Sequence, residues 1–264
     1  MGFKGFDEPL VEGKRIPINW FLIGECGSNW RGRLQEAEQL IQICAESGLT
    51  CAKFQAFRNE HVSKLPEEVR QEVLPCAITP SNVNDIYALC KKHKIAFGCT
   101  AFYPEAIAFL DRYVKFWKIR ELDSRSVVRK GKSDLVDACL QTQKPVLIST
   151  QELPADNFYL FHPSIKWLIC LPKYPTRMEE FPFWRLLTRA WNGVSLHIPD
   201  PLAPLTAAIM GANIIEMHVT ISRNENYPDN PVSLTMEEIK QVTGSLKKLE
   251  KAQIRLSPDY SGLV

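Results

Sequence analysis

The stretch Trp20-Phe-Leu-Ile-Gly-Glu-Cys-Gly-Ser-Asn29 runs from a short, nearly unbroken apolar segment directly into polar residues. Strands that are buried on both faces, as in the parallel sheets of α/β proteins, have this continuous apolarity. The turn that follows lacks the glycine-rich GxGxxG pattern of a dinucleotide-binding sheet, and that pattern occurs nowhere in the chain. The stretch therefore predicts the first strand of a parallel α/β fold that is not of the dinucleotide-binding type.

Similar apolar segments recur along the chain and alternate with amphipathic ones. The predicted strands are Trp20–Cys26, Thr50–Phe57, Ile95–Phe102, Phe116–Arg120, Pro145–Thr150, Ile165–Leu171, Gly193–Ile198 and Ile214–Thr220. The predicted helices are Leu34–Ser47, Pro80–Lys92, Pro104–Leu110, Ser133–Thr142, Phe183–Trp191, Leu202–Met210 and Thr235–Leu256. We expect Glu152–Ser164, which contains Pro154 and Pro163, to form an irregular loop or one helical turn. This order favours a (β/α)8 TIM barrel over a doubly wound sheet.

Length and composition agree with one barrel of ordinary size. The 264 residues, 45% hydrophobic and 23% charged, predict a single TIM-barrel domain over residues 1–264, with a core at about 18–256 between a short lead-in and a tail. A net charge of +2 argues against binding to nucleic acid or a membrane surface. The chain contains no apolar run long enough for a membrane span and no signal-peptide segment, so we expect a cytoplasmic protein.

The cysteines are scattered and form no CxxC pair, which excludes a zinc ribbon. Most lie inside apolar runs, where a free cysteine behaves as a small hydrophobic residue. We therefore expect buried, reduced thiols in a reducing compartment.

Polar residues gather where the predicted strands end, which is where TIM barrels place their active sites. They are Glu25, Asn29, Lys53, Gln55, Thr100, Lys118, Arg120, Glu121, Asp123, Ser149, Thr150, Lys173, Tyr174, Ser195, His197, Glu216 and His218. Burying an unpaired charge costs several kcal/mol, so this group needs mutual partners, a ligand or a metal.

Two sets within this group point to different ligands. His197 and His218 end neighbouring strands and could bind one divalent ion, with Glu216 on the same strand face as His218. Alternatively, both histidines are held by hydrogen bonds within the barrel. Lys53 and Lys118, together with Arg120 if the fourth strand stays regular, suit a phosphate or carboxylate. The alternative is that they form salt bridges with Glu25, Glu121 and Glu216.

Several of these segments together resemble the N-acetylneuraminate (sialic acid) synthase family, from about Phe21 to Leu249. The matching motifs are Glu25-Cys-Gly-Ser-Asn29, Lys53-Phe-Gln55, Thr100-Ala-Phe102, Trp117-Lys-Ile119, Lys144-Pro-Val-Leu-Ile-Ser-Thr150, Tyr174-Pro-Thr176 and Glu216-Met-His218, followed by Pro228-Asp229. The resemblance covers the barrel domain only, and we expect this chain to lack the family's small C-terminal antifreeze-like domain.

The resemblance implies metal-dependent condensation of phosphoenolpyruvate (PEP) with an aldehyde sugar similar to N-acetylmannosamine. The product is a 2-keto-3-deoxy (nonulosonic) acid, and phosphate is released. A homodimer is a further expectation. By position, His197 and His218 would hold the metal, with Mn²⁺ expected and Mg²⁺ or Co²⁺ as alternatives. The proposed catalytic residues are Glu25, Lys53, Lys118 and Glu216. The proposed substrate-binding residues are Gln55, Thr100, Arg120, Asp123, Ser149, Tyr174, Ser195 and Asp229.

This sequence also departs from the family pattern. Glu121 stands where the family has a phosphate-binding serine, and Pro172 replaces an amide side chain. A fixed carboxylate repels phosphate unless Arg120 pairs with it or takes over the phosphate. Two alternatives to the PEP synthase therefore remain: a diverged metal-dependent barrel enzyme that uses another donor, and a non-catalytic sugar-binding barrel.

Overall fold

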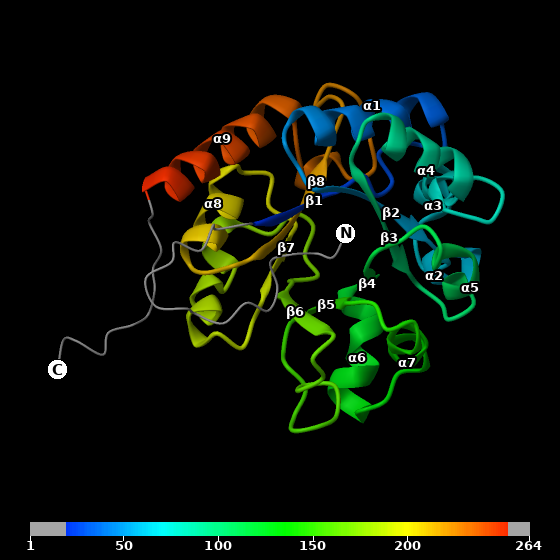
Figure 1. Ribbon diagram of the computed structural model, residues 1–264. Helices are drawn as coiled ribbons and strands as arrows, with labels where there is room; N and C mark the ends of the chain where they lie inside the picture. The colour runs from blue at the N-terminus through cyan, green and yellow to red at the C-terminus, as the bar shows by residue number, and fades with distance from the viewer. Residues whose placement is uncertain (1–19, 253–264) are drawn as a thin grey trace.

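Eight parallel strands close into a ring in the computed structural model, which describes residues 20–252 (Figure 1). The strands are β1 Phe21–Glu25, β2 Cys51–Ala56, β3 Ala96–Ala101, β4 Trp117–Ile119, β5 Val146–Thr150, β6 Ile165–Ile169, β7 Gly193–Leu196 and β8 Ile214–Val219. Each strand pairs with the next, and β1 also pairs with β8. The predicted (β/α)8 TIM barrel is confirmed. The expected lead-in, the tail and the outer edges of the expected core lie outside the described residues.

Helices cover the outside of the ring, mostly where the apolar periodicity predicts them. They are α1 Leu34–Glu46, α4 Val83–Lys92, α5 Ala106–Leu110, α7 Asp134–Gln141, α8 Leu202–Ile209 and α9 Met236–Ala252. In α1 the buried face consists of Ala37, Leu40, Ile41, Ile43 and Cys44, the spacing of an amphipathic helix that packs on a sheet. A two-residue strand, β9 Ser233–Leu234, extends the sheet beside β8.

Helix α6, Glu121–Lys130, begins directly after β4 and was not predicted from the sequence. Its sequence has few apolar residues, and these do not mark the buried face: Val127 is buried, whereas Leu122 is exposed. The helix ends at Gly131, which adopts a left-handed conformation (φ 62°) that glycine tolerates. Three further elements between β2 and α4 were not predicted: α2 Asn59–Val62, α3 Glu67–Val73 and the 3₁₀ turn η1 Leu74–Cys76.

The connections that follow β5 and β6 contain no α-helix. The segment between these strands has no helix, as expected, and Figure 1 shows it as a long loop. The predicted helix Phe183–Trp191 is wrong, because the chain forms the 3₁₀ helix η3, Phe183–Thr188. Its backbone bonds span three residues, as from Arg185 N–H to Pro182 O (3.0 Å), and Arg189 ends it in a left-handed conformation. The remaining short turns are η2 Met178–Glu180 and η4 Asn230–Val232.

The barrel interior is divided into two zones. Apolar side chains fill the end where the strands begin: Phe21, Ile23, Cys51, Phe116, Leu147, Leu168 and Ile214. Two residues farther along most of these strands, the inward-facing side chains become polar. Because inward positions recur every second residue in a strand, this change marks the floor of a site that opens at the strands' C-terminal ends.

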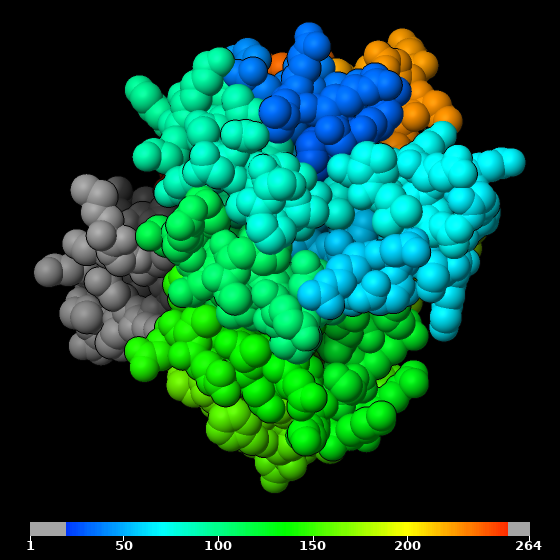
Figure 2. All heavy atoms as spheres, turned by 90° about the vertical axis from the view of Figure 1, so that its right-hand side faces the viewer, coloured from blue at the N-terminus to red at the C-terminus, as the bar shows by residue number. Residues whose placement is uncertain are grey.

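Outside this ring, the main hydrophobic core lies between the strands and the helices. In Figure 2 the first half of the chain, coloured blue to green, makes up most of the face that carries α2 to α5. Within residues 20–252, no helix is both long and apolar enough to cross a membrane.

Candidate active site

Seven strands contribute one side chain each to a polar layer above the apolar floor. Its members are Glu25, Lys53, Thr100, Lys118, Ser149, Ser195 and Glu216, and none is more than 3% exposed. Register places them side by side: Glu25 lies opposite Lys53, Thr100 opposite Lys118, and Ser195 opposite Glu216. The structure therefore brings these predicted site residues together.

Glu216 lies between the two buried lysines. Its carboxylate oxygens are 3.7 Å from Lys53 Nζ and 3.4 Å from Lys118 Nζ, and Ser195 Oγ donates a hydrogen bond to it (2.7 Å). Burial raises the pKa of Glu216, but the two ammonium groups outweigh burial and lower it to about 2. Glu216 is therefore a fixed anion that holds both cations in place.

Glu25 has a different electrostatic environment. It forms an ion pair with Lys53 and accepts a hydrogen bond from Gln55 Nε2 (2.6 Å). Burial is the largest influence and raises the pKa of Glu25 to about 7; Lys53 opposes this shift and Glu216 adds to it. At neutral pH this carboxyl group is thus close to half ionised, the condition for a proton donor or acceptor.

Hydroxyl groups surround the lysines. Lys53 Nζ donates to Thr100 Oγ1 (2.7 Å). Ser149 Oγ is buried and has no hydrogen-bond partner within the described residues. Buried polar atoms nearly always have a partner, so an unsatisfied hydroxyl in the same layer as two cations points to a polar ligand at this place.

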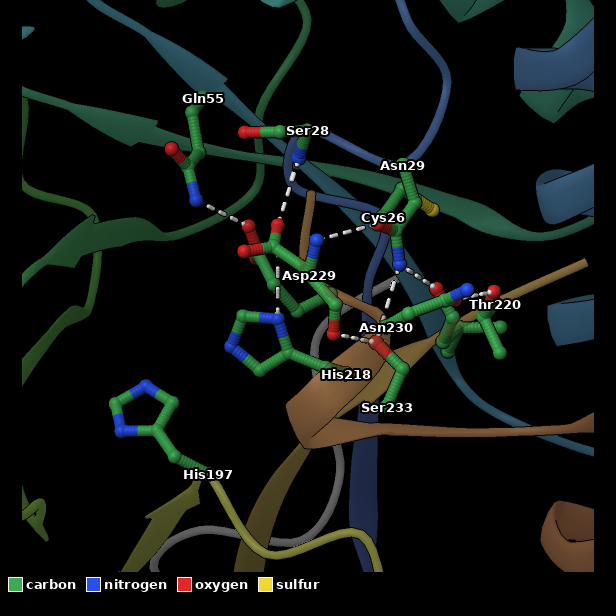
Figure 3. A network of polar contacts seen from close by, with 12 residues as sticks. Cys26, Ser28, Asn29, Gln55, His197, His218, Thr220, Asp229, Asn230 and Ser233 are labelled. Carbon is green, nitrogen blue, oxygen red and sulfur yellow. Dashed lines mark hydrogen bonds and ion pairs between the residues drawn. The ribbon is translucent and has the colours of Figure 1, made fainter. Parts of the chain in front are cut away.

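The two predicted metal-binding histidines lie next to each other at the end of β7 and β8, with ring centres 5.2 Å apart (Figure 3). His197 Nδ1 donates to the Leu171 carbonyl (2.9 Å), so its Nε2 accepts the hydrogen bond of the Tyr174 hydroxyl (2.7 Å). His218 Nδ1 is buried without a hydrogen-bond partner in the described part of the chain, 3.9 Å from Asp229 Oδ2.

Both histidines are in a state that suits a metal ligand. Burial lowers the pKa of each ring to about 3, and for His197 the neighbouring His218 adds to this shift. Neutral imidazoles fit a divalent transition ion; His218 has an unused buried nitrogen, Nδ1, whereas His197 would have to give up the hydrogen bond from Tyr174. Among residues 20–252, however, no three His, Cys, Asp or Glu side chains are arranged to hold a metal. An ion here would have two histidine ligands, and its other positions would be left to water or substrate.

Glu216 does not join the histidines, although it shares a strand face with His218. Two residues along a strand correspond to about 6–7 Å, which places its carboxylate in the layer of the lysines. The alternation of residues along β8 correctly predicted that Glu216 and His218 face the same side of the strand, but not that they lie at different heights along the barrel axis.

Asp229 reaches the site from the segment after β8. Its Oδ2 accepts a hydrogen bond from Ser28 N–H (2.9 Å), and its own N–H donates to Asn29 Oδ1 (2.8 Å). A Cβ on Gly27 (φ 44°) would lie 2.3 Å from Asp229 Oδ2, so only glycine permits this approach. Asn29, a strand-end candidate to which the sequence assigned no role, is fully buried and also donates to the Val219 carbonyl and Ser233 Oγ. Its place directly after the first strand and in the first matching motif were the sequence signals.

Arg120 does not face inward beside Lys118 as expected. Strand β4 ends at Ile119, and the Arg120 side chain lies at the rim, 27% exposed. It pairs with Asp123 (2.6 Å) and stacks over the Phe102 ring at 3.8 Å. Two of the predicted substrate-binding residues therefore lie outside the polar layer and bind each other.

Glu121, the departure from the family pattern, is buried but neutralised. Arg125 binds both of its carboxylate oxygens (3.0 and 2.8 Å), and Gln151 Nε2 donates to it (2.7 Å). Arg120 does not pair with it. This three-residue clamp joins the ends of β4 and β5.

Comparison with known proteins identifies the family. The model described as "NeuB family" matches residues 40–256. The N,N'-diacetyllegionaminic acid synthase of Legionella pneumophila is 28% identical, over 87% of this chain and 72% of its own length. Human N-acetylneuraminate-9-phosphate synthase is 22% identical, over 88% and 70%.

Solved structures agree on the fold. The crystal structure of N-acetylneuraminic acid synthetase from Leptospira borgpetersenii, 23% identical, has a TM-score of 0.79 and covers 92% of this chain and 88% of that one. A truncated 3-deoxy-D-arabino-heptulosonate 7-phosphate synthase from Thermotoga maritima has a TM-score of 0.64 at 13% identity. The family match spans most of the barrel and the named relatives are sugar-acid synthases, so the chain belongs to the NeuB family.

Proposed function

We propose that the protein condenses PEP with the open-chain aldehyde form of a sugar similar to N-acetylmannosamine, giving a 2-keto-3-deoxy acid and phosphate. The observation that carries this proposal is the buried pair Lys53 and Lys118. They share Glu216, and a pKa of about 7 leaves Glu25 only partly ionised at neutral pH. The layer therefore has an excess of positive charge that an anionic donor would neutralise.

In this reaction, Lys53 and Lys118 bind the carboxylate and phosphate of PEP, and Thr100, Ser149 and Ser195 donate hydrogen bonds to them. C3 of PEP forms a bond to the aldehyde carbon, whose oxygen takes up a proton from solvent. Water adds at C2 and gives one of its protons to Glu25. The bond from C2 to the phosphate oxygen then breaks, and phosphate leaves with the remaining proton of the C2 hydroxyl as the C2 carbonyl forms.

The residues near the entrance would orient the sugar. Gln55 holds Glu25 in place, and Tyr174 and Asp229 lie beside the two histidines. A divalent ion held by His197 and His218, for which we propose Mn²⁺, would polarise the aldehyde oxygen as a Lewis acid. The described cysteines are all free and buried, which supports the proposed cytoplasmic location.

Two alternatives each have a specific observation in their favour. The Glu121–Arg125–Gln151 clamp favours a donor without phosphate, because it fills space between β4 and β5 with a carboxylate. The pairing of both lysines with carboxylates favours a non-catalytic sugar-binding barrel. The non-catalytic barrel is less favoured because Lys118 pairs only with Glu216, which also pairs with Lys53.

Thermal unfolding of metal-free protein with Mn²⁺, with PEP and with both distinguishes these possibilities. A ligand that binds only the native state adds about 2.7 kcal/mol of stability at a hundredfold excess over Kd. The proposal predicts stabilisation by PEP when Mn²⁺ is present, followed by phosphate release with a suitable sugar. Stabilisation by Mn²⁺ alone would indicate another donor, and stabilisation by neither would indicate the non-catalytic barrel.

A further inference from the structure

A cationic and aromatic cluster lies at the rim of the barrel, outside the polar layer. Phe102 and Tyr103 directly follow β3, and each carries an arginine from a neighbouring strand end. The Arg58 guanidinium carbon lies 3.9 Å from the Tyr103 ring centre, and that of Arg120 lies 3.8 Å from the Phe102 ring centre. His61 stacks on Tyr103 and meets Phe102 edge-on. We call Arg58, His61 and Arg120, with these two rings, the rim cluster.

The donors of this cluster are oriented but only partly used. Within the described residues, the Arg58 guanidinium donates no hydrogen bond, and its ion pairs to Glu60 and Glu105 are long, at 3.9 and 3.6 Å. Both of those carboxylates are largely exposed, at 64% and 68%, and so are well solvated. Stacking on an aromatic ring fixes the plane of a guanidinium while leaving its N–H edges open to a ligand.

The other two members are more constrained. Arg120 uses Nε and Nη2 on Asp123, which leaves its Nη1 for another acceptor. His61 Nδ1 accepts a hydrogen bond from the Arg58 N–H (3.1 Å), so its neutral ring carries the proton on Nε2 and can donate it. All three side chains thus offer donors, the set that binds a phosphate or carboxylate group.

The height of the cluster indicates which substrate it meets. Gln55, Thr100 and Lys118 lie in one register layer. Phe102 and Arg120 lie two residues beyond that layer, and Arg58 three, which corresponds to roughly 7–10 Å. A donor whose anionic groups bind the buried lysines does not extend this far. The histidines belong to β7 and β8, whereas the rim cluster follows β2, β3 and β4. An open-chain sugar stacked above the donor, with its aldehyde at the histidines, would extend across the mouth of the barrel toward the rim cluster.

We propose that the rim cluster binds an anionic group, a phosphate or carboxylate, at the far end of the acceptor sugar. The inference rests on the proposed function, because it takes the donor to occupy the polar layer. It makes Arg58 and Arg120 specificity-determining residues that select an acidic acceptor over a neutral one.

Calorimetric titration tests this without turnover. The probes are N-acetylmannosamine, its 6-phosphate, inorganic phosphate and PEP, each with the intact chain, and the two sugars are also titrated with PEP and Mn²⁺ present. We expect the sugar phosphate to bind at least about tenfold more tightly than the neutral sugar, as charge-assisted hydrogen bonds imply. Inorganic phosphate should bind more weakly than the sugar phosphate, since it lacks the sugar contacts.

Arg58→Gln should remove most of this preference while leaving affinity for the neutral sugar and for PEP unchanged, and Arg120→Gln should also reduce the preference. Arg58→Lys, which keeps the charge but loses the planar fork, should retain part of it. The matched control is Arg112→Gln, because Arg112 also stacks on a neighbouring ring, Tyr113 at 4.7 Å, but precedes β4 at the opposite end of the barrel. Circular dichroism checks that each variant folds.

Equal affinity for both sugars, or no binding of either sugar, would overturn the inference. Loss of PEP binding in the arginine variants would also overturn it, because the rim cluster would then bind the donor's phosphate. Equal affinity for inorganic phosphate and the sugar phosphate would overturn it as well, because it would show an anion site that does not recognise the sugar. Failure of the proposed function is distinguishable. If the arginine-dependent preference is present but phosphate is never released, the rim subsite stands without the synthase reaction. If phosphate is released with a neutral sugar and no preference for the sugar phosphate is found, the synthase reaction stands without the rim subsite.

Discussion

At the scale of single residues, this site depends on how burial shifts ionisation in opposite directions. Glu25 and Glu216 lie in the same layer, but Glu216 faces two lysines whereas Glu25 faces one, and their pKa values lie at about 7 and about 2. Carboxylates separated in this way can take different roles, one moving a proton and the other holding charge. Neither role follows from residue type alone.

The pH dependence of the reaction tests the role of Glu25. To accept a proton from water, Glu25 must be ionised, so kcat/KM should rise with pH through about 7. Glu25→Gln should abolish this rise of kcat/KM with pH and reduce turnover by about 10²–10⁴-fold. Gln55→Leu removes a hydrogen bond that favours the ionised form, so the midpoint should move to higher pH. An unchanged profile in Glu25→Gln would assign the proton transfer to another group.

Tyr174 and a metal ion would compete for one nitrogen. Because the Tyr174 hydroxyl donates to His197 Nε2, a divalent ion there must displace it. Tyr174→Phe should therefore bind Mn²⁺ about two- to tenfold more tightly, given the modest net value of one hydrogen bond. Calorimetry or the electron paramagnetic resonance signal of free Mn²⁺ measures this, with His197→Ala as the control that loses binding. Weaker binding in Tyr174→Phe would instead mean that the hydroxyl orients the ligand.

At the scale of elements, helix α6 changes the site most. Because β4 ends early and α6 starts at Glu121, Arg120 moves to the rim and Glu121 turns toward Arg125, one helical turn away. Gln151 then connects this helix to the end of β5. The fourth strand thus contributes Lys118 to the polar layer and a neutralised carboxylate beside it.

This arrangement predicts opposite effects for the two partners of the ion pair. Glu121→Ser removes a carboxylate near the lysines and should tighten PEP binding by at least about tenfold, whereas Arg125→Gln leaves Glu121 uncompensated and should weaken it. Isothermal titration with PEP in the presence of Mn²⁺ gives both values. If neither variant changes the affinity, the clamp lies too far from the donor to influence it.

At the scale of the whole molecule, closure of the ring brings the first strand, β1, next to the last strand of the ring, β8. Strand β8 pairs with both β7 and β1, and the segment after it reaches back to the turn after β1 through Asp229. Figure 3 shows this convergence of Ser28, Asn29, Asp229 and His218 from segments nearly 200 residues apart. The site therefore exists only when the barrel is closed.

Two glycines test this with opposite expectations. A Cβ at Gly193 would lie 1.9 Å from the Ile214 carbonyl oxygen across the β7–β8 pair, so Gly193→Ala should lose about 3 kcal/mol or more. Gly244, within α9, has no atom within 4 Å of an added Cβ, so Gly244→Ala should gain about 1 kcal/mol. Urea unfolding measures both. A small effect at Gly193 would show that β7 and β8 separate easily, contrary to the closed ring.

The sequence by itself determined the barrel, the order of its strands and the residues of the polar layer. Each strand is marked by a local apolar run, and strand ends in such a fold converge at one mouth, so Lys53, Lys118 and His218 could be placed without coordinates. Missing from that account were α6, whose apolar periodicity is weak, and the 3₁₀ form of η3, whose sequence resembles an ordinary helix.

The tertiary structure decided how these residues act. Register placed Glu216 beside the lysines and not the histidines, and burial moved the pKa of Glu25 to about 7. The end of β4 turned Arg120 toward Phe102. These properties depend on distances of a few ångströms between strands far apart in sequence, and electrostatic energies vary steeply over such distances in a buried site. Local sequence patterns contain no information about those distances, so only the closed barrel defines them.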